Sequence, residues 1–417
     1  MSIIKPFRSV RPAKDLVNRI AALPYDVYNR REAKDIVSEN PMSFLKIDRA
    51  ETMFPDDQDM YAPEVYGKAR SVYQEMLENG AFIRERSESY YLYELTMNGH
   101  TQTGLVACAS IDDYINGVIK KHENTREDKE LDRIQHVDTM SAQTGPIFLA
   151  YRSHPEMQNL TKIIKEREVL YDFTGEDFVR HRVWKIDSPA EISHITDIFS
   201  EISQIYIADG HHRAASAVKV GLKRRAAHPD YQGNEEFNYF LSVIFPSDEL
   251  KIFDYNRVVA DLKGHTFTDF LAQLETSFTI LPVDSQPYAP QAKGEFGLYG
   301  NGCWYCLRQK RNPNASDAKD PVSALDVSIL QDTILSPILG IKDPKTDSRI
   351  SFVGGIRGLK ELQNMVDAQG EGVAISLYPT SMQELLAVAD AGMLMPPKST
   401  WFEPKLRSGI FIHEIEK

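Results

Sequence analysis

An acid, a glycine, two imidazoles and a guanidinium stand next to one another in one short run, Asp209-Gly210-His211-His212-Arg213. Apolar residues before the run predict a buried strand, and the alanine-rich residues after it predict a helix. A helix start offers unpaired backbone N–H groups and a positive dipole end, and both attract anions. Glycine allows close approach to a ligand, and a guanidinium suits phosphate oxygens. The run predicts a phosphate-binding turn; the alternative is an ordinary helix start with Asp209 as its N-cap.

A second polar group follows another apolar stretch, residues 115–119, and reads His122-Glu123-Asn124-Thr125. A glutamate between a strand and a helix could accept the proton of a substrate hydroxyl, as phosphoryl transfer to an alcohol requires. The structural alternative is an acid that complements the dipole of a helix start. Residues 125–128 resemble a capping box, with Asp in place of the usual Glu or Gln.

These segments resemble known families. The Asp-Gly-His-His-Arg run resembles the phosphate-binding turn of the ParB/sulfiredoxin superfamily, in which sulfiredoxins carry Gly-Gly-Cys-His-Arg and archaeal free serine kinases an Asp-Gly-His-containing version. The whole chain resembles the bacterial and archaeal family called domain of unknown function 1015 (DUF1015), through segments 23–27, 122–125 and 395–400. The resemblance implies phosphoryl transfer between a phosphate donor and a small hydroxyl compound, with free L-serine or phosphoserine first.

The same resemblance implies roles for individual residues. A glutamate that precedes the Asp-Gly-His segment is the catalytic base of the serine kinases, so Glu123 is the candidate base here, with Asp209 and His211 as further catalytic candidates. The phosphates of ATP, ADP or pyrophosphate would bind to Gly210, His211, His212 and Arg213. Mg²⁺ would bridge donor oxygens, with Asp209 as a candidate ligand. The candidates for substrate binding are Tyr25, Asp26, His122, Asn124 and Thr125.

The segment Pro396-Pro397-Lys398-Ser399-Thr400 ends like a Walker A loop. Both prolines lack the N–H groups that a phosphate cradle needs, and no glycine precedes Lys398 at the required spacing. Lys398, Ser399 and Thr400 nevertheless offer one cation and two hydroxyls, so they are candidates for phosphate binding. An ordinary surface loop fits the pattern equally well.

Composition narrows the class of protein. The chain of 417 residues has a net charge of −12 and only three cysteines, and its pI is near 5.5. The acidic balance disfavours nucleic-acid binding, because such proteins carry a basic face. No apolar stretch reaches the roughly 18 residues of a membrane span, and the first residues lack the apolar core of a signal peptide. Three cysteines form no disulfide framework, so we expect a cytoplasmic protein.

Two other functions stay open at this point. One is a ParB-like nucleotide-dependent switch that binds nucleic acid or a partner protein without small-molecule chemistry. The other is a metal-dependent phosphohydrolase, in which His122, Asp209 and one of the two adjacent histidines hold a divalent ion. Adjacent side chains at a helix start diverge by roughly 100°, so both histidines could not easily bind one metal.

The pattern around these motifs predicts an α+β fold, with a ParB/sulfiredoxin-like mixed α/β core, insertions and a C-terminal α/β segment. Residue spacing predicts helices at 13–22 and 63–78 and a hairpin of strands 91–96 and 104–111. In the helix after Thr125 we expect an inner apolar side of Leu131, Ile134 and Val137 and a solvated charged side. Polar residues 309–323 predict a linker or loop between a catalytic region, 1–308, and a segment, 324–417, that would help to complete the site.

Overall fold

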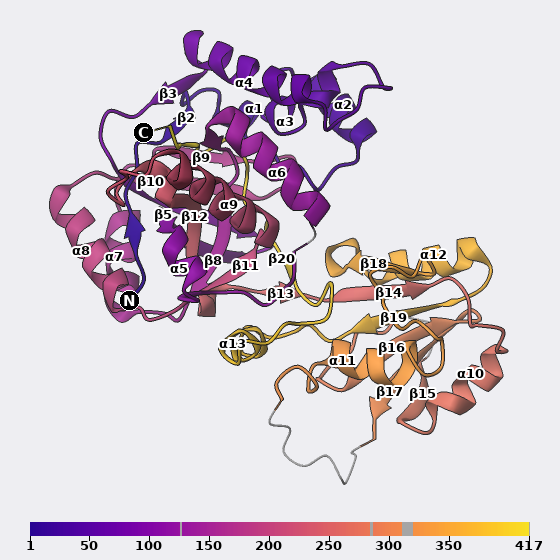
Figure 1. The fold of residues 1–417 in the computed structure, drawn as a ribbon. Coiled ribbons are helices and arrows are strands. Elements are labelled where there is room, and N and C mark those ends of the chain that lie inside the picture. Colours follow the sequence, from indigo (N-terminus) through magenta and orange to yellow (C-terminus); the bar gives the residue numbers. More distant parts are fainter. Residues whose placement is uncertain (126, 284–286, 311–319, 417) are drawn as a thin grey trace. The chain divides into compact units, whose positions relative to one another are not determined.

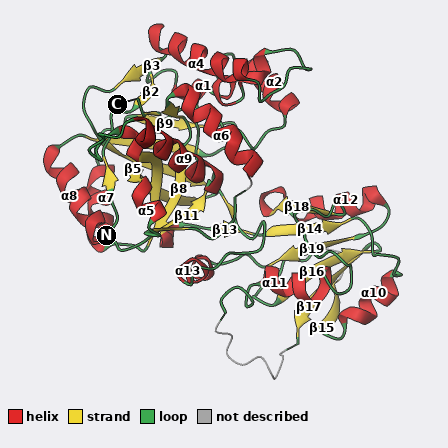
Figure 2. Ribbon diagram, viewed as in Figure 1, coloured by secondary structure: helices red, strands yellow, loops and turns green. Residues whose placement is uncertain are grey.

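The computed structural model describes residues 1–125, 127–283, 287–310 and 320–416. The chain divides into two compact units, of which the first comprises Met1–Leu250 and Pro404–Lys417 and the second Lys251–Glu403. Helices and strands occur in both units (Figure 2), which confirms the predicted α+β class. Within these described ranges, no helix is long and apolar enough to cross a membrane.

A mixed sheet forms the centre of the first unit (Figure 1). Its strands are β1 (Ile4–Lys5), β4 (Tyr90–Met97), β5 (His100–Ser110), β6 (Ile119–Lys120), β8 (Ile147–Tyr151), β9 (Tyr171–Thr174), β10 (Arg180–Ile186), β11 (Ile205–Asp209) and β12 (Tyr239–Pro246). They lie in the order β6-β11-β8-β12-β5-β4-β10-β9, with β1 beside β5. The β4–β5 hairpin turns at Asn98-Gly99, as the sequence predicts.

Helices cover this sheet and extend from it. They are α1 (Val17–Ile20), α2 (Arg30–Glu39), α3 (Leu45–Asp48), α4 (Pro63–Glu78), α5 (Ile111–Ile115), α6 (Glu127–Met140), α7 (Pro155–Lys165), α8 (Pro189–Glu201) and α9 (His211–Ala227). Alternation along β5 places Leu105, Ala107 and Ala109 in one core cluster with Phe199 of α8 and Ala214 of α9. Full burial of a large apolar side chain stabilises the fold by about 1.5–3 kcal/mol.

The N-terminal helices follow the sequence only in part. Helix α4 has the predicted bounds, since proline stands at its first turn and an apolar stripe faces a core of its own. Helix α1 is much shorter than the predicted 13–22, because the preceding residues form β2 (Val10–Pro12), which pairs with β3 (Phe82–Arg84), and then turn. The expected apolar segment 115–119 is mostly the end of α5 and a turn, and only its last residue belongs to β6.

The chain returns from the second unit to the first through residues 404–417. The end of this segment, β21 (His413–Glu414), pairs with β7 (Ala142–Gln143). Ser408 forms a two-way backbone bridge with Ala22, with N···O distances of 2.8 and 3.2 Å. The Gly409 N–H donates to the Thr144 carbonyl at 3.1 Å. This tail therefore ties the N-terminal helices to the start of β8.

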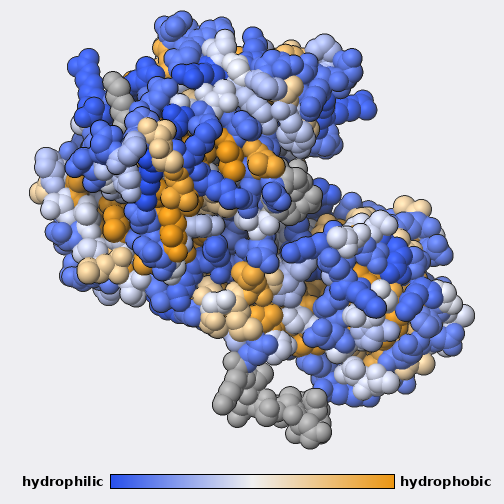
Figure 3. All heavy atoms as spheres, viewed as in Figure 1, coloured by the Kyte–Doolittle hydropathy of each residue, from blue (hydrophilic) through white to orange (hydrophobic). Residues whose placement is uncertain are grey.

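The second unit is built on a sheet of its own, in the order β15-β17-β16-β19-β14-β18. Its strands are β14 (Tyr255–Val259), β15 (Phe278–Val283), β16 (Glu295–Gly300), β17 (Cys303–Gln309), β18 (Ile350–Gly354) and β19 (Val373–Leu377), and a separate pair joins β13 (Ile252–Phe253) to β20 (Trp401–Phe402). Its helices are α10 (Phe267–Leu274), α11 (Asp326–Leu330), α12 (Leu359–Gln369) and α13 (Met382–Asp390). The face in Figure 3 is mainly hydrophilic, with separate apolar patches.

The division between units differs from the predicted linker at 309–323. Strands β16 and β17 precede that segment and β19 follows it, yet all three lie in one hydrogen-bonded sheet. Such pairing joins the two flanks into one unit, so the chain divides after Leu250 instead. Residues 311–319 of the predicted linker lie outside the described residues.

Candidate functional site

The two polar motifs lie at the same edge of the first unit's sheet. Strands β6 and β11 are parallel neighbours, with Ile205 opposite Ile119, so their carboxyl ends meet. The rings of His122 and His211 are 4.5 Å apart between centroids and nearly perpendicular, at 88°. Glu123 Oε2 lies 3.9 Å from His211 Nδ1. The structure thus brings together the candidate base and the start of the predicted phosphate-binding turn.

Gly210 forms the turn itself. It has φ 92° and ψ 32°, a left-handed conformation that favours glycine, and it is the N-cap residue of α9. The N-cap is therefore not Asp209, whose Oδ1 accepts the Gly210 N–H at 2.8 Å. A Cβ at position 210 would lie 3.0 Å from Arg213 Nε. A side chain here would press on the guanidinium that packs across the turn and would strain the left-handed backbone.

Arg213 keeps one edge of its guanidinium available. Nη1 donates to the Pro146 carbonyl, 2.8 Å away, at the start of β8. Nε and Nη2 form no hydrogen bond with any described residue, and both face the position that a Gly210 Cβ would take. Two N–H groups on one planar edge can bind a phosphate in the bidentate manner that makes arginine common in such sites.

Asp209 has a charge partner that the sequence prediction did not include. Lys405 Nζ, from the returning tail, lies 2.9 Å from Asp209 Oδ2. Burial disfavours the carboxylate, but Lys405 and then Arg213 outweigh it and hold the pKa of Asp209 well below its ordinary value. Asp209 is thus ionised at neutral pH. These partners are 196 residues apart in sequence, and no spacing rule could have joined them.

The histidine pair is buried and neutral. His122 has no exposed surface, and neither of its ring nitrogens has a hydrogen-bond partner of good geometry among the described residues. Burial lowers the pKa of His122 to about 4, against the opposing attraction of Asp209. Burial and the nearby His122 likewise lower the pKa of His211 well below its ordinary value. Both imidazoles are therefore uncharged at neutral pH.

The metal alternative finds no support in this geometry. Within the residues that the structure describes, no group of three or more His, Cys, Asp or Glu side chains is arranged to hold a metal ion. The two imidazoles contact each other edge to face, and the Asp209 carboxylate is already paired with Lys405. A resident metal held by protein side chains alone does not fit these positions.

The remaining substrate-binding candidates have different environments. The Tyr25 ring lies under the Arg133 guanidinium, with 3.9 Å from Cζ to the ring centroid. Asp26 and Asn124 are exposed, and His212 is half-buried in the first turn of α9. The Thr125 hydroxyl donates to the Glu130 carboxylate. The predicted capping box, residues 125–128, includes residue 126, which lies outside the described residues.

Helix α6 follows the prediction only in part, because Leu131 faces outward and charged side chains are buried. Leu131 is 53% exposed, whereas Arg133 is 7% and His136 only 3% exposed. Ile134 and Val137 are half-buried and pack on a small cluster with Val220. Apolar periodicity misplaces Leu131 because Arg133 and His136 of this helix, and not only apolar residues, line a cavity beside Arg213. Arg133, His136 and Asp48 line this cavity, and none of them was among the residues that the sequence predicted.

The candidates Lys398, Ser399 and Thr400 belong to the second unit. Lys398 is exposed and has φ 56°, and its carbonyl accepts from Arg257 Nη2 at 2.9 Å. Ser399 is buried, and its hydroxyl donates to the Pro396 carbonyl at 2.6 Å. The Ser399 hydroxyl therefore fixes the loop locally. Phosphate binding at this loop stays a prediction.

Comparison with known proteins identifies the family. A family model described as protein of unknown function (DUF1015) matches residues 4–328. The chain belongs to the DUF1015 family. No curated protein matches it significantly.

Solved structures show only distant likeness. A free serine kinase in complex with AMP is 15% identical, with 72% of this chain and 86% of that chain covered and a TM-score of 0.34. A conserved hypothetical protein from Pyrococcus furiosus is 14% identical, with coverage of 74% and 94% and a TM-score of 0.35. C-terminally truncated SbnI from Staphylococcus aureus is 11% identical, with coverage of 72% and 82% and a TM-score of 0.36.

Proposed function

We propose that this DUF1015 protein is a phosphotransferase that moves a phosphoryl group between a nucleotide or pyrophosphate donor and a small hydroxyl compound, with free L-serine as the first acceptor to test. One observation carries the proposal: the open Nε–Nη2 edge of Arg213 lies across the turn that starts α9, and Glu123 stands at the same sheet edge. An anion site beside a carboxylate is what transfer from a phosphate to an alcohol needs.

The donor side of the site consists of fixed positive groups. The first N–H groups of α9 have no partner within the helix, and the left-handed Gly210 allows close approach of an oxyanion. Arg213 would bind the phosphate of the donor that becomes the leaving group. Lys405, which pairs with Asp209, lies at the start of the same turn. These groups would stabilise the negative charge that the leaving oxygen gains.

Mg²⁺ fits the site as a companion of the donor. Mg²⁺ is usually held by one or two carboxylates together with substrate phosphate oxygens, and the ionised Asp209 supplies one such carboxylate. When bound, the ion would neutralise phosphate charge during transfer. Binding at Asp209 would require Lys405 to leave Oδ2, and the phosphates next to it offer Lys405 a new partner.

On the acceptor side, Glu123 would take the proton from the acceptor hydroxyl as the new oxygen–phosphorus bond forms. The bond from phosphorus to the donor oxygen breaks, and the electron pair leaves with that oxygen. His211 Nδ1, 3.9 Å from the glutamate, would orient it through a hydrogen bond when the ligand draws the groups together. The Glu123 side chain is 30% exposed, so an acceptor hydroxyl could reach it from solvent.

Phosphorus NMR tests the proposal directly. The full chain is incubated with Mg²⁺, L-serine and one donor at a time: ATP, ADP or pyrophosphate. A phosphoserine resonance with one donor supports the proposal and identifies the donor. If the donor is hydrolysed equally with and without L-serine, the protein would be a phosphohydrolase. If the donor binds but is not consumed with any small alcohol, the protein would be a nucleotide-binding switch.

A further inference from the structure

A second and larger cavity lies between helix α7 and the sheet of the first unit. Its volume is about 450 Å³, which falls within the roughly 300–1,000 Å³ of small-molecule sites. Two exposed residues of α7, Lys162 and Glu166, line it, so the cavity opens to solvent. Its apolar part consists of buried side chains from the sheet, α7 and the end of β12: Leu105, Tyr151, Met157, Ile244 and Pro246.

This cavity is separate from the proposed phosphate site. Arg213 donates to the Pro146 carbonyl just before β8, whereas Tyr151 is the last residue of that strand. Five residues of extended chain span about 16 Å, so these two positions lie far apart. Among the described residues, none of those that line the cavity belongs to the two polar motifs. A ligand here would be additional to the donor and the acceptor, and the inference does not depend on the proposed function.

The Tyr151 hydroxyl is an unused hydrogen-bonding group on this cavity. Tyr151 is only 3% exposed, and its hydroxyl has no hydrogen-bond partner in the part of the chain that the structure describes. Burial raises the pKa of Tyr151, and the negative charges of Glu249 and Asp248 raise it further. The phenol is therefore protonated and lies in negative surroundings. Buried polar groups normally have a partner, which an occupant of the cavity would supply.

Glu249 contributes an unpaired negative charge to the same cavity. Its Oε2 accepts the Thr103 N–H at 2.7 Å, and its carboxylate forms no ion pair with a described residue. Lys165 also lines the cavity, but its ammonium contacts the buried Glu94 carboxylate. Burial raises the pKa of Glu249 against the opposing effects of the Thr103 N–H and Lys165. A half-buried carboxylate without a counter-ion is stabilised by a cation that enters from solvent.

We propose that this cavity binds a small primary ammonium ligand with a short apolar chain. The ammonium would donate to the Glu249 carboxylate and to the Tyr151 hydroxyl oxygen, which line the same cavity. The chain would pack on the apolar part of the wall. An anionic ligand would instead be repelled by Glu249, and it would find only the exposed Lys162, whose attraction solvent screens.

Three probes of similar size isolate the charge of the head group. Calorimetric titration of the full chain compares pentylamine, pentan-1-ol and pentanoate, which share an unbranched five-carbon chain. Their head groups are positive, neutral and negative. We expect pentylamine to bind at least about tenfold more tightly than the other two, because it alone forms a charge-assisted bond with Glu249. Equal affinities, tighter binding of pentanoate or no binding of pentylamine would overturn the inference.

Two amide substitutions locate the ammonium. Glu249→Gln keeps an acceptor for the Thr103 N–H but removes the charge, so it should abolish the preference for pentylamine. Glu166→Gln is the matched control on the same cavity: Glu166 is exposed, so solvent screens its charge and all three affinities should change little. If Glu166→Gln abolishes the preference and Glu249→Gln does not, the amine binds at the outer surface and the inference fails.

Tyr151→Phe tests the hydroxyl separately from the fold. Loss of one hydrogen bond should weaken pentylamine binding by roughly three- to tenfold. Tm should stay the same or rise slightly, because the hydroxyl has no partner in the described structure. A lower Tm with unaltered pentylamine binding would make the hydroxyl a structural group and contradict the proposed contact. The same thermal melt shows whether Glu249→Gln and Glu166→Gln are folded.

Discussion

Arg213→Ala should separate ligand binding from stability. The guanidinium makes one hydrogen bond inside the protein, to the Pro146 carbonyl at 2.8 Å, while its Nε–Nη2 edge is free in the described structure. Loss of that one bond costs about 1 kcal/mol of unfolding free energy. For a unit of this size, this corresponds to a fall in Tm of about 2–4 °C. The structural cost is therefore small.

The expected cost to donor binding is larger. A charge-assisted hydrogen bond contributes about 1.5–3 kcal/mol, and the free edge can make two that partly overlap in effect. A loss of about 2–4 kcal/mol weakens the donor Kd by roughly 30- to 900-fold. Calorimetry with each nucleotide and a thermal melt measure both quantities on the same preparation.

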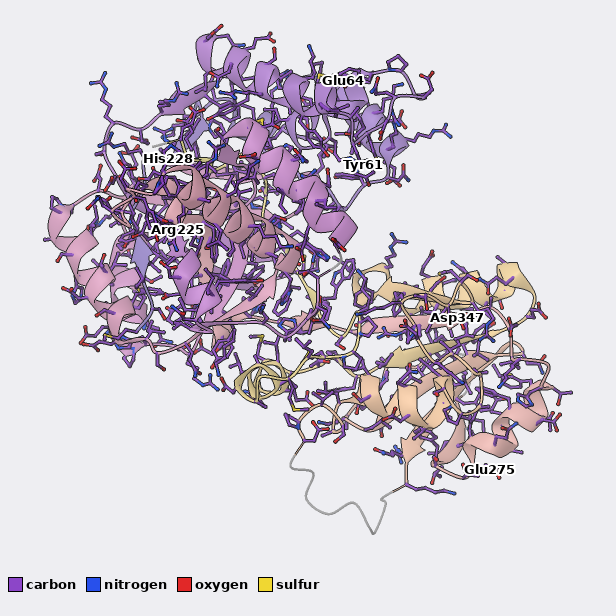
Figure 4. All side chains as sticks on the ribbon, in the orientation of Figure 1. Tyr61, Glu64, Arg225, His228, Glu275 and Asp347 are labelled. Atoms are coloured by element: carbon purple, nitrogen blue, oxygen red, sulfur yellow. The ribbon has the colours of Figure 1, made fainter. Side chains whose placement is uncertain are left out.

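Arg225 provides the matched control on the same helix (Figure 4). Its guanidinium forms two hydrogen bonds with Asp112, both at 2.7 Å, and a further one with Asn238. Arg225→Ala should lower Tm at least as much as Arg213→Ala and leave the donor Kd unchanged. If Arg213→Ala binds every donor normally and melts far earlier than the control, Arg213 is a structural residue and the phosphate assignment fails.

Further predictions concern the acid, the ion pair and the buried imidazole. Glu123→Gln should lower kcat by roughly 10²–10⁴-fold with little change in donor Kd; near-normal turnover would return Glu123 to the role of a helix-start acid. Asp209→Asn should raise the Mg²⁺ concentration that gives the half-maximal rate. Lys405→Met should lower that concentration and weaken donor binding. If Asp209→Asn and the unaltered protein gave the same Mg²⁺ titration, Asp209 would be excluded as a ligand. The pKa of His122 is about 4 when folded and 6.5 when unfolded, so the unfolded chain binds the extra proton between these values. The free energy of unfolding should thus fall by about 3 kcal/mol for this group as the pH drops from 6.5 to 4. Urea titrations should show a flatter pH profile for His122→Gln, and an unchanged profile would contradict the burial effect.

The sequence predicts the local structure well where one rule decides it. The spacing of Val65, Ala69, Val72 and Met76, with proline at the first turn, determines α4. Asn98-Gly99 determines the β4–β5 turn. The strand–turn–helix around Gly210 follows from its alanine-rich flank and the glycine that a left-handed turn requires.

The rest depends on contacts that no local pattern contains. Apolar periodicity assigns Leu131 to the buried side of α6. Arg133 lies on that side instead, because Asp48 and Tyr25, from other segments, give the guanidinium polar neighbours. Composition marks 309–323 as a linker between domains, although the strands on either side of this segment pair in one sheet. Lys405 reaches Asp209 only because the chain returns after residue 403.

That return has a consequence for how the protein is made. Residues 404–417 are translated after the whole second unit, yet they supply Lys405 and the bridge from Ser408 to Ala22. A nascent chain that has emerged up to Leu250 exposes the proposed anion-binding turn, and Asp209 then has Arg213 nearby but not yet Lys405. Ribosome-bound intermediates should therefore stay open at this edge of the sheet, and the first unit closes only once the second has been synthesised.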